Sequence, residues 1–368
     1  MEEQTDEAMM RRALALASRG RGLVSPNPLV GAVVVHDGQV VGEGWHDGPG
    51  NPHAEIHALR AAGDLARGAT LYVTLEPCDH HGRTPPCTNA ILEAGVARVV
   101  AAARDPNPIV DGRGFDRLRS AGVDVVADVL KAEAERLNEA FATHVRTGLP
   151  FVVLKMAATL DGKVAARDGS SRWITGREAR AEVHRMRASA DAILVGAGTA
   201  LADDPSLTVR DPEYRGRPVL RVLADARGRV RPAARLFSDD APTLVATTEM
   251  APGERRREWS RAGAEVVVFD PTDGGVPLDA LFADLGKRDV QLVLLEGGPT
   301  LAWSAVREGL LDRVVLFLAP KLVGGAGAPG ILGGEGLAPI AEALDVEIVD
   351  VARVGPDIKV EARVHRDR

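Results

Sequence analysis

The sequence predicts a chain of two α/β domains joined in tandem. Short apolar stretches alternate with amphipathic stretches along almost the whole chain, which is typical of strands packed between helices. The turn-forming segment TGLP at residues 147–150 separates two such patterns. With 368 residues, the chain is also long enough for two domains of ordinary size. We therefore expect one domain over residues 1–147 and a second over residues 151–368.

The first half has the periodicity of several short strands and helices. Asp37-Gly38 lies between two apolar runs and predicts a hairpin turn. The predicted strands are residues 29–36, 39–45, 70–75, 96–102 and 123–126, and the predicted helices are residues 6–18, 53–62, 86–94 and 131–146.

The second half repeats the alternation on a larger scale. Strands that alternate with helices indicate a largely parallel sheet with helices on its faces. The predicted strands are residues 151–156, 192–195, 218–223, 242–247, 264–269, 290–295 and 313–319, with a closing hairpin of residues 346–351 and 358–364. The predicted helices are residues 177–188, 278–285 and 300–308.

The composition restricts the classes of function. The formal net charge is −7, whereas a general nucleic-acid binder would usually present a basic surface, so we expect no nucleic-acid partner. A local basic pocket for a phosphate is still allowed. No apolar run is long enough to span a bilayer, and the N-terminus lacks the basic start of a signal peptide. We therefore expect no membrane partner and a cytoplasmic location.

Four residues between positions 53 and 87 have the chemistry of a catalytic zinc site. His53 precedes Glu55 by two positions, and the two cysteines of the chain, Cys78 and Cys87, follow in the same stretch. Two cysteines are no disulfide framework, and cysteines beside a histidine in a reducing compartment more often bind metal. One imidazole and two thiolates leave the fourth tetrahedral position of zinc open for water. Glu55 would then carry a proton rather than bind the metal.

Each of these residues has an ordinary structural alternative. A single helical histidine is usually structural, and a free cysteine is usually a small core residue. The combination of His-x-Glu before a strand and Pro-Cys after it favours metal. A purely structural zinc site would need a fourth ligand, for which His57, His80 and His81 are the candidates. We expect His57 to pack or hydrogen-bond, and His80, His81 or Arg83 to contact substrate or solvent.

Two glycine-rich turns in the second half also follow a strand and precede a helix or loop. They are GAGT at residues 196–199 and EGGPT at residues 296–300. Free backbone N–H groups at such a turn suit an anion, although turns of this kind more often serve tight packing. Neither turn matches G-x-G-x-x-G, so the fingerprint of a Rossmann dinucleotide site is absent.

The zinc motif resembles that of the cytidine deaminase-like superfamily, in which H-x-E is followed by P-C-x-x-C. Here eight residues, not two, separate the cysteines. The segment TLEPCDHHGRTPPC, with SPNPLVGAVVV, GEGWH, HAEIHAL, ARDPNP and GRGFDRL, resembles one branch in particular. That branch is the family of bifunctional pyrimidine deaminase/reductases of riboflavin biosynthesis. The second half is similar as well, through KMAATLDGKVAARDGSSRWITG and HRMRASADAILVGAGTALADDPSLTVR.

The resemblance implies a fold and two activities. The fold would be an N-terminal cytidine deaminase-like three-layer domain followed by a C-terminal dihydrofolate reductase-like domain. The first domain would use one Zn²⁺ per chain to deaminate 2,5-diamino-6-(5-phosphoribosylamino)pyrimidin-4(3H)-one. The second would use NADPH to reduce the ribosyl side chain of 5-amino-6-(5-phosphoribosylamino)uracil to ribityl. The family also implies a homo-oligomer, a dimer or tetramer.

The resemblance further implies a set of site residues. Asn27 would line the pyrimidine pocket, although an asparagine between two prolines also suits a turn. The substrate of the reductase would contact Lys155, Ser171, Arg187, Leu207, Arg210 and Glu296. The dinucleotide would contact Ala157, Trp173, Thr199, Asp203, Gly298, Pro299, Thr300, Leu301, Ala302, Trp303 and Ser304. The forked donors of the arginines suit a phosphate. Trp173 could instead pack in the core or at its rim, and Asp203 could instead cap a loop.

Two other functions are possible from the motifs alone. A nucleobase or RNA deaminase with an unrelated second domain is disfavoured by the cysteine spacing, the acidic charge and the similar second half. A zinc-stabilised binding protein without turnover would keep its fold and function after loss of the Glu55 carboxylate.

Overall fold

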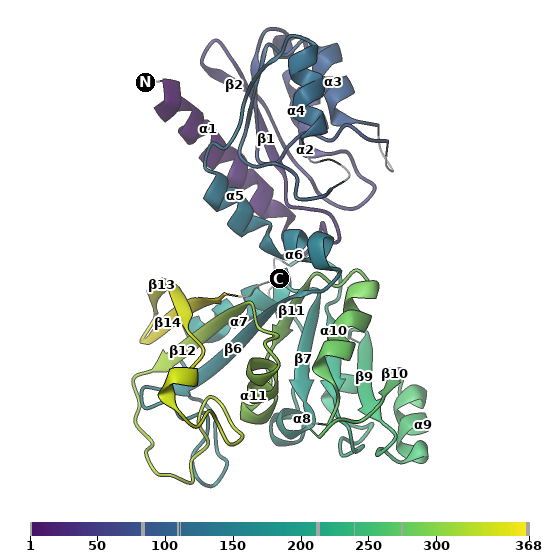
Figure 1. The fold of residues 1–368 in the computed structure, drawn as a ribbon, viewed down its shortest axis with the longest axis vertical. Helices are drawn as coiled ribbons and strands as arrows, with labels where there is room; N and C mark the ends of the chain where they lie inside the picture. Colours follow the sequence, from purple (N-terminus) through teal and green to yellow (C-terminus); the bar gives the residue numbers. More distant parts are fainter. Residues whose placement is uncertain are drawn as a thin grey trace. The chain divides into compact units, whose positions relative to one another are not determined.

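In the computed structural model, the chain divides into two compact units, Met1–Gly148 and Leu149–Arg368. The structure describes residues 2–81, 85–108, 110, 112–210, 214–238, 240–273 and 275–365. Each unit has its own β-sheet, its own helices and its own apolar core (Figure 1). Each unit therefore positions its own set of functional side chains.

The first unit is built on a sheet of five strands, which are β1 (Gly31–His36), β2 (Gln39–Trp45), β3 (Thr70–Val73), β4 (Arg98–Ala101) and β5 (Asp124–Val126). Their order in the sheet is β2-β1-β3-β4-β5. β1 pairs antiparallel with β2 and with β3, whereas β3, β4 and β5 are parallel. Asp37 and Gly38 both have positive φ, which confirms the predicted hairpin turn.

Helices cover both faces of this sheet, so the unit has three layers. The helices of this unit are α1 (Glu2–Ala17), α2 (Ala54–Ala62), α3 (Cys87–Ala94), α4 (Arg113–Ser120), α5 (Lys131–Leu137) and α6 (Glu139–Thr147), with the 3-10 turns η1 (Ser18–Gly20) and η2 (Gly63–Ala66). A Cβ on Gly31 would come within 2.1 Å of a carbonyl oxygen of α1. Gly42 is paired with Val34 and therefore faces the other side of the sheet. A Cβ on Gly42 would come within 2.1 Å of a carbonyl oxygen of α2. Glycine at both positions lets the helices pack directly on the strands.

Two helical segments differ from the prediction. The helix predicted over residues 131–146 is interrupted at Asn138, between α5 and α6. The Asn138 side chain instead bonds the backbone N–H and C=O of Leu29, at 2.8 and 2.9 Å. Helix α4 was not predicted, because Phe115 and Leu118 are its only buried side chains apart from a glycine and most of the others are charged or polar. Both differences are therefore tertiary effects that periodicity does not report.

The second unit is built on nine strands, which are β6 (Phe151–Thr159), β7 (Ala192–Gly196), β8 (Leu220–Ala224), β9 (Thr243–Thr248), β10 (Glu265–Phe269), β11 (Leu292–Leu295), β12 (Arg313–Ala319), β13 (Val346–Val354) and β14 (Asp357–Val364). Their order is β10-β9-β8-β7-β11-β6-β12-β14-β13. In this order, all strands from β10 across the sheet to β12 are parallel to one another. The β13–β14 hairpin lies at one edge, where β14 pairs antiparallel with β12 and with β13. This confirms the predicted, largely parallel sheet with a closing hairpin.

The helices of the second unit flank this sheet (Figure 1). They are α7 (Arg177–Ser189), α8 (Ala197–Asp203), α9 (Gly253–Arg261), α10 (Leu278–Lys287) and α11 (Pro299–Arg307), with the 3-10 turns η3 (Arg235–Phe237) and η4 (Ile340–Glu342). Helix α9 was not predicted, because Trp259 is its one buried residue. Among the described residues, no helix is both long enough and apolar enough to cross a membrane.

Candidate active sites

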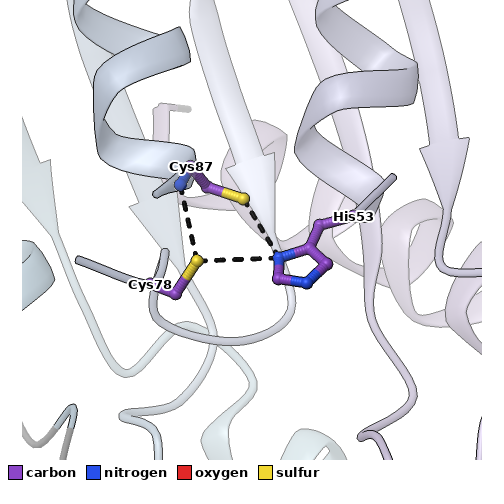
Figure 2. A group of neighbouring side chains, drawn as sticks. All are labelled: His53, Cys78 and Cys87. Atoms are coloured by element: carbon purple, nitrogen blue, oxygen red, sulfur yellow. Dashed lines mark hydrogen bonds between the residues drawn. The ribbon is translucent and has the colours of Figure 1, made fainter. Parts of the chain in front are cut away.

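Three side chains with metal-binding atoms converge in the first unit. The Nδ1 atom of His53 and the Sγ atoms of Cys78 and Cys87 all lie within 4.8 Å of one another, and Figure 2 shows them directed toward a common centre. The His53 Nδ1 atom is 3.2 Å from the Cys87 sulfur and 3.6 Å from the Cys78 sulfur. Tetrahedral zinc with its usual bond lengths would hold such a nitrogen and sulfur about 3.5 Å apart. The donor set and its spacing therefore fit one zinc ion.

These donors come from three segments that the fold brings together. His53 is the N-cap of α2, Cys87 is the first residue of α3, and Cys78 lies in the segment after β3. The Cys87 backbone N–H donates to the Cys78 sulfur at 3.4 Å. The hydrogen bond from the Cys87 thiol lowers the pKa of Cys78 to about 4, against the effect of burial, and His53 adds to this. The site is thus prepared to present a thiolate, the form that binds metal.

Glu55 lies in the first turn of α2, two residues after His53. Its side chain is buried, and its Oε2 atom accepts no hydrogen bond from the described residues. Burial, with a contribution from the Cys78 thiolate, raises the pKa of the Glu55 carboxyl to about 6. A carboxyl with this pKa can both accept and release a proton near neutral pH.

Asn27 is connected to this cluster through a residue that the sequence did not single out. Its amide nitrogen lies 2.9 Å from Nε2 of His46, whose Nδ1 atom lies 3.2 Å from the carbonyl oxygen of Pro52. Burial lowers the pKa of His46, so its ring is neutral, with the proton on Nδ1 facing Pro52. Nε2 then accepts from Asn27, which leaves the Asn27 Oδ1 atom available to a ligand. His46 also stands edge-on to His53, with ring centroids 5.4 Å apart.

The other histidines of this stretch lie outside the three-donor cluster. His57 faces Asp47, with 3.9 Å between Nε2 and Oδ1. His80 and His81 are exposed. Arg83 lies outside the described residues. The described part of the chain therefore offers three donors at this point, as a catalytic zinc site requires.

The second unit contains a cleft of about 1420 Å³ where several parallel strands end. Most of the predicted reductase residues line this cleft. They are Lys155, Ala157, Ser171, Trp173, Arg187, Thr199, Asp203, Leu207, Arg210, Glu296, Gly298, Pro299, Thr300, Leu301 and Ser304. Ala302 and Trp303 do not line it: Ala302 is buried in the apolar core, and the Trp303 ring packs where a Cβ on Gly334 would fall. Their positions on α11 turn both side chains away from the cleft.

A buried group of three charges lies in this cleft. Glu296 accepts hydrogen bonds from Arg187 Nε at 2.6 Å, from Arg187 Nη2 at 3.1 Å and from Lys155 Nζ at 3.3 Å. Burial opposes ionisation of Glu296, yet the two cations lower the pKa of its carboxyl to about 2. Glu296, which directly follows β11, therefore holds two cations in fixed positions: Lys155 in the middle of β6 and Arg187 in the last turn of α7.

The cleft also contains arginines that the sequence did not single out. Arg227 and Arg229 line it just beyond the end of β8, and Arg235 lines it from η3. The buried Asp225 carboxylate orders the loop that carries the first two, because it accepts the backbone N–H of Arg227 at 3.3 Å and of Val230 at 2.8 Å. In the sequence, only the tripeptide Arg227-Gly228-Arg229 signals this feature.

Comparison with known proteins finds a matching protein family for each of the two units. The family model described as "Cytidine and deoxycytidylate deaminase zinc-binding region" matches residues 3–103, and the model described as "RibD C-terminal domain" matches residues 150–360. Riboflavin biosynthesis protein RibD of Escherichia coli K12 is 45% identical, over 96% of this chain and 98% of the relative. The chain belongs to the RibD family.

Solved structures of RibD proteins agree over the whole chain. Acinetobacter baumannii RibD, form 1, superimposes with a TM-score of 0.88 at 37% identity, covering 99% of this chain and all of that one. A deaminase/reductase of Thermotoga maritima gives 0.87 at 39% identity, with the same coverage. The predicted fold is confirmed: a cytidine deaminase-like domain precedes a reductase domain. The chain is a bifunctional deaminase and reductase of riboflavin biosynthesis that uses zinc and NADPH.

Proposed function

We propose that this RibD protein carries out two reactions on one phosphorylated pyrimidine. The first is hydrolytic deamination of 2,5-diamino-6-(5-phosphoribosylamino)pyrimidin-4(3H)-one, which we assign to residues 1–147. The second is reduction of the ribosyl side chain of 5-amino-6-(5-phosphoribosylamino)uracil, which we assign to residues 151–368. The name of the Thermotoga relative supports this pair of substrates. The observation that carries the proposal is the His53–Cys78–Cys87 cluster with the buried Glu55 beside it.

In the deamination, His53, Cys78 and Cys87 hold the metal. Zinc, when bound, supplies a Lewis acid that lets a water molecule ionise near neutral pH. Glu55 would take one proton from the water and deliver it to the pyrimidine ring nitrogen, and would then move the second proton, from the hydroxyl group now on the ring carbon, to the leaving amine. Water is consumed, ammonia leaves, and the amine-bearing carbon becomes a carbonyl. The fixed amide of Asn27 presents Oδ1 to an N–H group of the pyrimidine, which orients the ring.

In the reduction, the chain positions cofactor and sugar. NADPH, when bound, supplies the hydride. Lys155 and Glu296 contact the sugar where the hydride arrives, and Arg187 keeps Glu296 ionised and in place. Arg210, exposed at the rim and bonded at 3.3 Å to Ser206, suits the substrate phosphate. Ser171 and Leu207 complete the substrate side of the cleft.

The cofactor lies along the remaining wall of the cleft. Gly298 caps α11, and a Cβ there would come within 3.2 Å of the Thr199 hydroxyl, so Thr199 lies against the start of this helix. Free N–H groups at a helix start suit the pyrophosphate. Ala157, Trp173, Asp203, the turn at residues 298–301 and Ser304 form the rest of the contact. Ala302 and Trp303 support the helix from the side away from the cleft.

Arg227 and Arg229 give a reason for NADPH rather than NADH. The sheet order places β8 next to β7, and β11 and β6 follow, so β8 ends on the opposite side of β7 from Glu296. With about 4.8 Å between neighbouring strands, the arginines lie roughly 10 Å from the reacting end. We infer that they bind the 2′-phosphate, which NADH lacks.

The second unit also supports a homo-oligomer. Val346, Ile348 and Val351 on the edge strand β13 are 44, 63 and 60% exposed. An exposed apolar edge strand is a surface that a second copy would cover. A dimer or tetramer in light scattering would agree with this proposal, and a monomer at micromolar concentration would contradict it.

The two free thiols suit a reducing compartment, which supports a cytoplasmic location.

The test of the whole proposal is to follow the two steps separately. The purified, zinc-loaded chain is given the diamino-pyrimidinone phosphate, and ammonia release and NADPH oxidation are recorded independently. Ammonia is expected without NADPH, and NADPH oxidation is expected with the deaminated compound alone. Failure of the chain to release ammonia from this substrate would overturn the assignment of the first unit.

A further inference from the structure

The two residues that directly follow the cysteines are bonded to one carboxylate. Asp79 follows Cys78, and Thr88 follows Cys87. The Thr88 hydroxyl donates to Oδ1 of Asp79 at 2.6 Å, and Nη1 of Arg117, on α4, donates to the same oxygen at 2.8 Å. One oxygen atom therefore joins both cysteine segments to a helix that contributes no side chain to the metal-binding cluster.

These bonds are partly or wholly shielded from water. Thr88 is fully buried, and the Asp79 side chain is 19% exposed. The outer partner, Arg117, is 42% exposed and also donates from Nη2 to the side chain of Asn89, the next residue of α3. A charged hydrogen bond in such a setting is stronger than the same bond at a fully exposed position. These hydrogen bonds are therefore suited to hold the segments that carry Cys78 and Cys87 in place.

Helix α4 is also fixed on the other side of Cys78. The buried Glu76 carboxylate accepts the backbone N–H of Gly112 at 3.0 Å and of Gly114 at 2.9 Å, which ties down the start of α4. A Cβ on Gly114 would lie 1.9 Å from the Pro77 carbonyl oxygen, so the helix rests directly on the segment that carries Cys78. Arg117 lies three residues further along α4, on the same face as Gly114.

We propose that Asp79 is a positioning residue for the zinc ligands. With Thr88 and Arg117, it holds Cys78 and Cys87 at the spacing that one ion needs, and so it slows the release of zinc. The proposal rests on the assignment of His53, Cys78 and Cys87 as the ligands. Residues that bond the surroundings of metal ligands commonly change metal affinity by about 10–100-fold when they are removed.

The experiment measures zinc transfer from the zinc-loaded full chain to an excess of a chromogenic chelator. Asp79→Ala and Thr88→Val should each release zinc about tenfold faster than the unmodified chain. Asp79→Asn keeps the shape of the side chain but loses its charge. It should release zinc faster than the unmodified chain and more slowly than Asp79→Ala. Because the two residues share one bond, the double variant Asp79→Ala/Thr88→Val should be little faster than the faster single variant.

Asp116→Asn is the matched control. Asp116 also lies on α4, but its side chain is 81% exposed and faces Arg119 at 3.8 Å. It should release zinc at the unmodified rate. NADPH oxidation with the deaminated substrate should be the same in every variant, which verifies that the second unit is intact.

Each way of failing has its own meaning. Unmodified release rates in both Asp79→Ala and Thr88→Val would overturn the positioning role. If Asp79→Ala does not load zinc, Asp79→Asn and Thr88→Val decide the matter by the same criterion. An unmodified chain that binds no zinc would instead overturn the ligand assignment, and with it the proposed deamination.

Discussion

At the scale of single residues, both sites use burial and charge to set protonation. Glu55 is buried beside a thiolate, and its pKa of about 6 lets it exchange protons near neutral pH. Glu296 is buried between Lys155 and Arg187, and its pKa of about 2 keeps it ionised. The two glutamates thus have opposite pKa shifts, because burial and a nearby thiolate raise the pKa of Glu55, whereas two cations outweigh burial at Glu296. We assign proton transfer to the first and positioning to the second.

Replacing Glu55 by glutamine should stop deamination alone. The amide cannot carry the proton, so ammonia release should fall by roughly 100-fold to 10,000-fold. NADPH oxidation with the deaminated uracil compound should continue at the unmodified rate. Asp64→Asn, an exposed carboxylate in the turn after α2, is the control and should change neither rate. Equal loss of both activities would contradict two separate sites.

Replacing Arg229 by alanine should alter the choice of cofactor. Loss of a charge-assisted contact should raise the Kd for NADPH about tenfold and leave the Kd for NADH nearly unchanged. Titration of nucleotide fluorescence measures both constants. Arg231→Ala is the control, because Arg231 is exposed but does not line the cleft. A parallel loss for both nucleotides would remove Arg229 from the 2′-phosphate site.

At the scale of elements, the zinc site depends on how closely helices approach strands. Helix α2 carries His53 at its cap and Glu55 in its first turn, and it packs on β2 at Gly42 and Gly44. A Cβ at Gly44 would lie 2.4 Å from the carbonyl oxygen of Ala54. The glycines of GEGWH therefore fix the position of α2 relative to the sheet.

Gly42→Ala should consequently weaken the first unit. The added methyl meets backbone rather than a movable side chain, so the free energy of unfolding should fall by about 1–3 kcal/mol. Thermal unfolding of the zinc-loaded chain measures the change. Gly38→Asn is the control. A Cβ at position 38 would meet nothing within 4 Å, and asparagine tolerates the φ of 74° at this position. Equal stability of the Gly42 and Gly38 variants would rule out the packing argument.

At the scale of the whole molecule, the two activities belong to two units with separate sheets and cores. The metal-binding cluster lies in the first unit, and the cleft lies wholly in the second. Neither site needs a side chain from the other unit among those that we assign.

Removal of zinc should therefore separate the two activities. After treatment with a strong chelator, ammonia release should be lost and NADPH oxidation with the deaminated compound should persist. Added zinc should restore ammonia release, whereas added magnesium should not, because thiolate ligands favour the softer metal. Loss of NADPH oxidation on chelation would show that the second site depends on the metal.

Much of this could be read from the order of residues along the chain. The two α/β halves follow from periodicity, because strands and helices repeat with different periods. The identity of the metal-type donors follows from residue chemistry and spacing, since imidazole, thiolate and carboxylate have few other uses in that pattern. Helices α4 and α9 escaped prediction, because each buries only one or two large side chains.

Only the tertiary structure decided which side chains meet. It placed His46 against Asn27, Asp79 between the cysteine segments, and Arg227 and Arg229 in the wall of the cleft. It also turned Ala302 and Trp303 away from the cleft, although they stand in the predicted run. These relations join residues far apart in the chain. They depend on the packing of helices on sheets, which the local pattern of a sequence does not encode.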